Sequence, residues 1–152
     1  MTKVTHNVDA RAVSKIMKKE IVAMVNDVVE AFAGAEADGE LVGVVSVLAA
    51  AGKSPPPSNP GDPPNWRTGT LARSWRTRKA KPSDKMVVAV AGTNVKYAEW
   101  LENGTKRNGK TFMAARPFMA KSVQSMEAYG KRRLKKAQTK IRREIQALGG
   151  PA

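Results

Sequence analysis

Apolar residues recur with helical spacing near the start of the chain. Between Asp9 and Phe32 they follow one another at intervals of three or four residues, which places them on one face of a helix. The members of this stripe are Val13, Met17, Ile21, Met24, Val28 and Phe32. Asp9 is suited to cap the first turn, and Gly34 is suited to end the last one. The pattern predicts a long N-terminal helix.

A second apolar stripe extends from about position 117 to position 148. Pro117 suits the first helical position, and the sequence Gly149–Gly150–Pro151 ends the pattern. Gly130 lies on the stripe, where it indicates either close approach by another backbone or a kink. The stripe predicts a long C-terminal helix, whose apolar members are Met119, Val123, Met126, Leu134, Ala137, Ile141, Ile145 and Leu148.

The segment between these helices begins with a stretch of mixed character. Residues 39–51 fit a short helix or a strand, and the run Leu48–Ala51 favours the helix. Residues 54–65 hold six of the nine prolines in the chain, which excludes regular helix and a central strand. We interpret them as an extended, exposed arm, whose composition fits a flexible linker and a docking arm equally well. We expect the arm to be an interface element, because proline lowers the entropy that is lost on docking.

Short elements of both kinds follow the arm. Residues 68–75 indicate a capped turn and then a short helix or strand, and residues 85–91 indicate a strand. Residues 97–101 indicate a two-turn helix, which Thr93 or Asn94 caps and Gly104 closes. The predicted fold is α+β, with a small antiparallel sheet flanked by the two long helices and a Pro-rich extended arm. We expect one domain over residues 1–152, with the arm at about 54–65 and the C-terminal helix at about 117–148.

Residue types that carry catalysis or hold metals are scarce. The chain has no cysteine, and its one histidine, His6, stands in a polar N-terminal stretch. Catalytic triads and sites built on Cys or His are therefore not expected. Glu36, Asp38 and Glu40 alternate near glycine and indicate a solvated turn. No apolar stretch reaches the roughly 20 residues of a membrane span. We expect a soluble protein with no catalytic residue, metal, cofactor, small-molecule substrate or membrane contact.

The chain is strongly basic, with 27 Lys and Arg against 13 Asp and Glu and a formal net charge of +14. Such an excess favours an anionic partner. One basic cluster accompanies Trp66 and Trp75 and consists of Arg67, Arg73, Arg76, Arg78, Lys79, Lys81 and Lys85. The second lies on the predicted C-terminal helix and consists of Lys131, Arg132, Arg133, Lys135, Lys136, Lys140, Arg142 and Arg143, with no acid in that span. No base-reading motif accompanies them, so the sequence predicts either DNA contact without sequence preference or an acidic protein face. The three tryptophans are expected in the core.

Three landmarks in the middle of the chain form a recognisable series. The stretch PGDPPNWRTGTLARSW at 60–75 joins a proline-rich segment to a T-G-x-L-x-x-S pattern, and YAEWLENGT at 97–105 and ARPFM at 115–119 follow in order. The series resembles a family of tailed-phage morphogenesis proteins: the tail-completion or neck proteins of the lambda-like "gene product ten" head–tail joining group. The residues that carry the resemblance are Pro63, Pro64, Thr68, Gly69, Leu71, Ser74, Tyr97, Leu101, Glu102, Gly104, Arg116, Pro117 and Phe118.

The resemblance implies a structural virion protein at the head–tail junction, present in the host cytoplasm during assembly. It implies a ring of about six copies that joins or finishes the tail. The implied partners are further copies of the chain, adjacent head–tail connector and tail proteins, and packaged DNA. An acidic protein face is slightly favoured for the basic helix, because a conduit that grips DNA would impede ejection. Two alternatives stay open: a basic, sequence-nonspecific nucleic-acid-binding protein, and a tail terminator or transient assembly factor.

The motif residues also have predicted structural roles. Thr68 is expected to cap a turn, Gly69 to allow a tight backbone, and Leu71 to be a buried anchor. Glu102 and Arg116 flank the loop 103–115, and a charge-assisted ion pair between them would close it. The alternative is that both side chains are exposed and contribute almost nothing.

Overall fold

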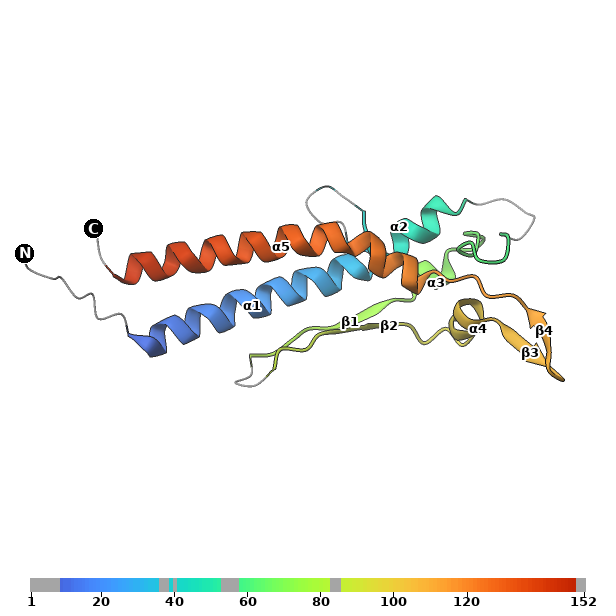
Figure 1. Cartoon of the computed structure of the whole chain (residues 1–152), viewed down its shortest axis with the longest axis horizontal. Coiled ribbons are helices and arrows are strands. Elements are labelled where there is room, and N and C mark those ends of the chain that lie inside the picture. The colour runs from blue at the N-terminus through green and yellow to red at the C-terminus, as the bar shows by residue number, and fades with distance from the viewer. Residues whose placement is uncertain (1–8, 36–38, 40, 53–57, 83–85, 150–152) are drawn as a thin grey trace, which may run out of the picture.

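Two long antiparallel helices, α1 (Ala10–Phe32) and α5 (Met119–Leu148), run along the molecule, with the start of α1 beside the end of α5 (Figure 1). The computed structural model describes residues 9–35, 39, 41–52, 58–82 and 86–149. Both predicted long helices are confirmed. The Asp9 carboxylate accepts a hydrogen bond from the Arg11 amide at 2.8 Å, which confirms the predicted cap of α1. The predicted solvated turn at Glu36, Asp38 and Glu40, and His6, lie outside the described residues.

The start of α5 and its buried face differ from the prediction. The helix begins at Met119, so Pro117 precedes its first turn and is not the first helical residue. The face buried against the rest of the chain carries Ser122, Met126 and Tyr129. α1 lies against one edge of the apolar stripe, and residues on the other edge stay exposed, Val123 by 61% and Leu134 by 46%. A Cβ added at Gly130 would meet nothing within 4 Å, so no described segment approaches it closely.

Three short helices and two hairpins connect α1 to α5. The helices are α2 (Gly43–Ala50), α3 (Thr70–Arg73) and α4 (Tyr97–Asn103). The first of them makes residues 43–50 of the stretch 39–51 helical, as the sequence favoured, while residue 40 lies outside the described residues. Gly104 ends α4 at φ +70° as predicted. Neither Thr93 nor Asn94 caps α4, because its N-cap is Lys96, which makes no side-chain cap bond.

The strands form two antiparallel hairpins instead of one sheet. β1 (Arg76–Arg78) pairs with β2 (Val90–Gly92), and β3 (Thr105–Arg107) pairs with β4 (Lys110–Met113). β2 starts five residues later than the predicted strand at 85–91. The three residues of β1 pair with 90–92, and no strand of the described ranges pairs with the residues at 86–89. The fold is α+β, as predicted, with two-stranded sheets flanked by the long helices.

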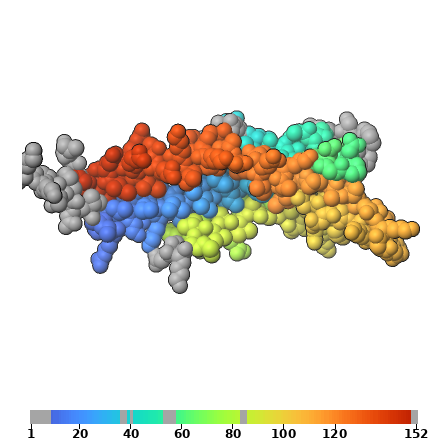
Figure 2. Space-filling model, in the orientation of Figure 1, coloured from blue at the N-terminus to red at the C-terminus, as the bar shows by residue number. Residues whose placement is uncertain are grey.

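The core lies where α2, α3 and α4 meet the start of α5. Trp75 is its centre, with its ring edge-on to Phe32 at 5.7 Å and to Phe118 at 6.4 Å between centroids. Val44 and Leu48 of α2 are buried in the same cluster. A smaller cluster joins α1 to α5 through Ala31, Met126 and Tyr129. Figure 2 shows the resulting elongated molecule, in which the outer halves of α1 and α5 extend away from this core.

Candidate interaction site

The turn before α3 is built as its sequence predicts. The Thr68 hydroxyl accepts a hydrogen bond from the Thr70 amide at 3.3 Å. Gly69 has φ +71°, and a Cβ there would stand 2.6 Å from the Trp66 indole nitrogen. Both constraints favour glycine. Leu71 is buried in the core, which confirms its role as an anchor.

Ser74 connects this turn to the segment before α4. Its hydroxyl donates to the Leu71 carbonyl at 2.7 Å and lies 2.5 Å from the Thr93 hydroxyl. Thr93 also accepts from the Val95 amide at 3.2 Å. The hydroxyl of the T-G-x-L-x-x-S pattern therefore ties α3 to the loop that leads into α4.

Glu102 caps the start of α5 and does not pair with Arg116. Its carboxylate accepts hydrogen bonds from the amides of Phe118 at 2.8 Å, Met119 at 2.9 Å and Ala120 at 3.3 Å. A negative group at this helix end also complements the helix dipole. Within the described residues no ion pair joins Glu102 to Arg116, so the predicted ion pair is wrong.

Arg116 binds the proline-rich segment instead. Its Nε donates to the Ser58 carbonyl at 3.0 Å, and its backbone amide donates to the Leu101 carbonyl at 2.7 Å. The Gly61 amide donates to the Ala115 carbonyl at 2.9 Å, and Pro64 is buried. Residues 58–65 are therefore tied to their own chain at Ser58, Gly61 and Pro64, while residues 59–62 are exposed, so the predicted exposed arm is right for 59–62 and wrong for Pro64. The rest of that arm, 54–57, lies outside the described residues.

Seven motif residues, distant in sequence, line one pocket of about 370 Å³. They are Pro64, Thr68, Gly69, Leu71, Tyr97, Leu101 and Arg116. Most of the other motif residues build the surrounding structure. Phe118 is buried in the core, and a Cβ at Gly104 would stand 2.7 Å from the Met113 carbonyl oxygen. Pro63 and Pro117 are half-buried. The pocket has a largely apolar wall that includes Arg67 and Arg116, and no acid, histidine or cysteine is among its lining residues in the part of the chain that the structure describes. Its chemistry fits binding of an apolar side chain.

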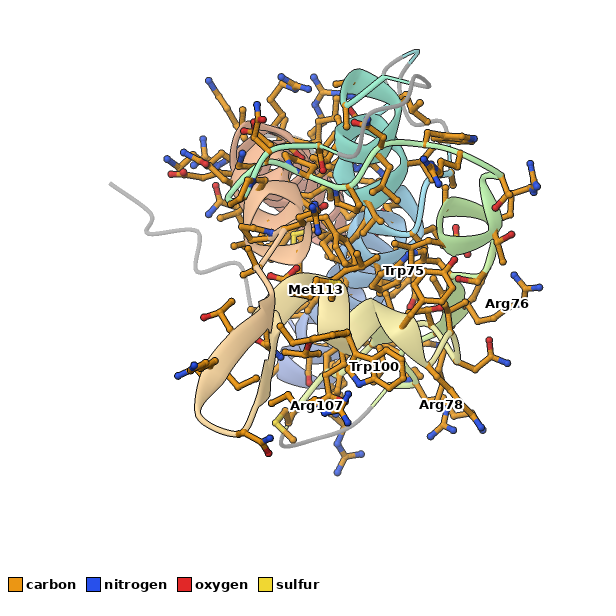
Figure 3. The ribbon with its side chains drawn as sticks, turned by 90° about the vertical axis from the view of Figure 1, so that its right-hand side faces the viewer. Trp75, Arg76, Arg78, Trp100, Arg107 and Met113 are labelled. Carbon is orange, nitrogen blue, oxygen red and sulfur yellow. The ribbon has the colours of Figure 1, made fainter. Side chains whose placement is uncertain are left out.

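A second feature is a set of exposed apolar side chains on several elements. Five large side chains on or beside β2, α4 and β4 are between 50% and 74% exposed: Met86, Val88, Val90, Trp100 and Phe112. Figure 3 shows Trp75 inside the molecule and Trp100 at its lower face. The prediction that the tryptophans are core residues is right for Trp75 and wrong for Trp100, while Trp66 is half-buried. Sequence reasoning missed these side chains, because residues 86–90 are all apolar in the sequence and the alternation of exposed Val88 and Val90 with half-buried neighbours appears only in the fold.

Acids of α1 oppose part of the basic cluster on α5. Asp27 forms an ion pair with Arg133, and Glu20 pairs with Lys140 at 2.9 Å. Glu20 is 4% exposed. Its hydrogen bond raises the pKa of Lys140 above the ordinary value of 10.5, and the charges of Glu20 and Glu144 act in the same direction. The second cluster thus has no acid in its own sequence span, but in the fold acids of α1 neutralise part of its charge.

The first basic cluster is less continuous. Lys79 pairs with Glu30 at 2.7 Å. Arg73 and Arg76 donate to backbone carbonyls, Arg73 to Thr68 at 2.5 Å and Arg76 to Trp75 at 2.8 Å. Lys85 lies outside the described residues.

Comparison of the chain with protein-family models, curated proteins and solved structures finds no match. Among the described residues, no group of three His, Cys, Asp or Glu side chains is placed to hold a metal ion. No described helix combines the length and the apolar character needed to cross a bilayer.

Proposed function

We propose that the chain is a structural, non-enzymatic subunit of a tailed-phage particle, located at the head–tail junction, where it joins further copies in a closed ring. The phage context rests on the resemblance carried by residues 60–75, 97–105 and 115–119. The gathering of seven motif residues around one pocket supports treating those stretches as one motif. Self-association rests on one kind of observation, the large apolar side chains that are exposed on β2, on α4 and on β4.

Such exposure is unusual for a protein that works alone. Monomeric proteins seldom expose adjoining large apolar side chains, because each one buried removes apolar area from water at about 25 cal/mol per Å². Phe112 is 74% exposed and Trp100 is 55% exposed. Each hairpin is also only two strands wide, so each leaves outer strand edges able to pair with another chain.

The positions of the hairpins favour a ring. β3–β4 forms one tip of the molecule, whereas β1–β2 lies alongside α1 (Figure 1). A contact between the β3–β4 tip of one copy and the β1–β2 face of the next joins two different surfaces. Such head-to-tail contacts generate a closed ring when the rotation between copies closes.

Native mass spectrometry of the purified chain at about 10 µM tests this proposal, since a functional ring needs at least micromolar affinity. We expect a ring of several copies for the wild type and monomers for Phe112→Ser combined with Val90→Ser. The conservative variant Phe112→Leu should keep the ring. Val123→Ser, which removes an equally exposed apolar side chain from α5, is the matched control.

A wild-type chain that is monomeric at this concentration would contradict the proposed ring. Detection of the chain in purified particles separates a virion component from a transient assembly factor. Its absence from the particles would exclude the virion location while leaving the ring to the mass measurement.

A further inference from the structure

The outward half of α5 carries an uninterrupted basic stripe. Six exposed residues succeed one another at intervals of one or three positions and line a shallow hollow of about 520 Å³: Arg132, Lys135, Lys136, Thr139, Lys140 and Arg143. At 100° per residue they fall on one side of the helix. We call these six residues the α5 stripe. It contains five cations and a threonine, with no acidic and no apolar side chain.

The acidic residues nearest to the stripe already form ion pairs between α1 and α5. Glu20 and Asp27 pair with Lys140 and Arg133, and Glu144 lies 3.9 Å from Lys19. Two cations of the stripe, Lys135 and Arg143, form no ion pair with any described residue, and neither does the neighbouring Arg142. The stripe therefore keeps an excess of positive charge that the fold does not neutralise.

The first turns of α1 add to this charge. α1 is antiparallel to α5, so its N-terminal turns lie beside the end of the α5 stripe (Figure 1). Residues 9–20 and 131–149 together hold twelve Lys and Arg against three Asp and Glu. This end of the helix pair therefore carries nine of the fourteen net positive charges of the chain. Charge gathered at one end gives a local field that a uniform distribution would not give.

We propose that the α5 stripe binds the phosphate backbone of double-stranded DNA without regard to sequence. From 132 to 143 the helix rises about 17 Å, a length of duplex that presents about five phosphates per strand. The five cations of the stripe, of which Lys140 also pairs with Glu20, are comparable in number to those phosphates. The stripe carries no Asn or Gln, the side chains that pair with adenine edges, and most of its cations are lysines, which suits backbone contact.

The composition of the stripe favours DNA over an acidic protein face. The centres of protein–protein interfaces are depleted in charged residues and enriched in aromatic ones, whereas protein–DNA interfaces are far more positive. The sequence alone slightly favoured an acidic protein partner, because it does not show which cations share one side of α5. The structure groups them without any apolar anchor among them, and this reverses the preference.

Fluorescence anisotropy with the full-length chain and a labelled duplex of about 30 base pairs and arbitrary sequence tests the proposal. The stripe variant replaces Arg132, Lys135, Lys136 and Arg143 with Gln, and it keeps Lys140 so that Glu20 retains its partner. The matched control removes four exposed charges from the other end of the molecule by replacing Arg78, Lys96, Lys106 and Arg107 with Gln.

For the wild type we expect binding that weakens steeply with salt and is equal for duplexes of different sequence. The stripe variant should lose about 100-fold in affinity at about 100 mM salt, and its slope of log affinity against log salt should be shallower by about three to four. The control should stay within about fivefold of the wild type, because distant charges act only through a screened field. If the fourfold variant unfolds, the pair Lys135→Gln and Arg143→Gln should still reduce the slope by about two.

Four outcomes would overturn the proposal. They are the absence of duplex binding at about 100 mM salt, an equal loss in the stripe variant and the control, a more than about tenfold preference for one sequence, and tighter binding to polyglutamate than to DNA. The last outcome would identify an acidic protein as the partner. None of them depends on ring assembly, since the stripe lies on α5 and shares no residue with β2, α4 or β4.

Discussion

The two ends of the molecule are held together by different interactions. Around α2, α3 and α4, aromatic and aliphatic side chains form a dry core centred on Trp75. Along the α1–α5 pair outside this core, few described side chains are buried, and ion pairs join the helices at Asp27–Arg133 and Glu20–Lys140. One end is stabilised mainly by removing apolar area from water, and the other adds electrostatic contacts that solvent and salt weaken.

The surfaces of these two ends also differ, one being apolar and the other basic. Apolar side chains are exposed at α4 and β4 beside the core and at β2 alongside α1, and the helical end exposes cations. An apolar surface suits a second protein chain, and a basic one suits a polyanion. Assembly and anion binding can therefore be changed separately, since no residue belongs both to the exposed apolar set and to the basic set.

The largest expected effect comes from breaking the core end at Trp75. Trp75→Ala removes a ring that packs edge-on against Phe32 and Phe118, and it should lower the free energy of unfolding by about 3–5 kcal/mol. Trp100→Ala is the matched control, because Trp100 is 55% exposed and should cost less than about 1 kcal/mol in a monomeric chain. Urea titration followed by circular dichroism measures both. Equal losses in the two variants would show that Trp75 is not the centre of the core.

The helices follow from sequence because their signals are local. Spacing of apolar residues, Asp9 as a cap and Gly104 as an end are all contained within a few turns, and each corresponds to an observed element. The buried face of α5 was not predictable in the same way. Its apolar stripe is wide, and the position of α1 against one edge of it depends on packing, which leaves Val123 and Leu134 exposed.

The candidate site also shows that local sequence patterns do not predict contacts between distant residues. Thr68, Gly69 and Leu71 have the predicted roles because these roles depend on neighbours in sequence. Glu102 was assigned the wrong partner. An opposite charge was the evident choice in sequence, whereas the fold offers three unsatisfied amides at the start of α5, where Phe118 supplies no side-chain cap.

A smaller effect is expected at the junction between the two ends, where Glu102 caps α5. Glu102→Ala leaves these amides without their acceptor and should cost about 2 kcal/mol of unfolding free energy. Glu102→Gln keeps an acceptor oxygen without the charge and should cost about half as much. Glu99→Gln, one turn earlier and exposed, should be nearly neutral. A Gln variant as damaging as the Ala variant would show that the charge, and not the acceptor oxygen, dominates.

The smallest effect concerns the ion pair between Glu20 and Lys140 at the helical end. Its dependence on pH distinguishes it from the packing and capping contacts. The pKa of Lys140 is raised, first by its hydrogen bond with Glu20, so folding stabilises its protonated form. This contribution is fully present below the pKa of the unfolded chain and is lost as pH rises through the higher pKa of the folded one. The melting temperature of the wild type should therefore exceed that of Lys140→Gln by a constant amount between about pH 6 and pH 9, and the gap should close above the ordinary value of 10.5.

Lys135→Gln, one turn away and without an ion pair among the described residues, removes the same charge and should show a gap that is small throughout. A Lys140 gap that persists unchanged above pH 11 would mean that the lysine stabilises the helix pair through the packing of its methylene chain, and then the electrostatic account of this end fails.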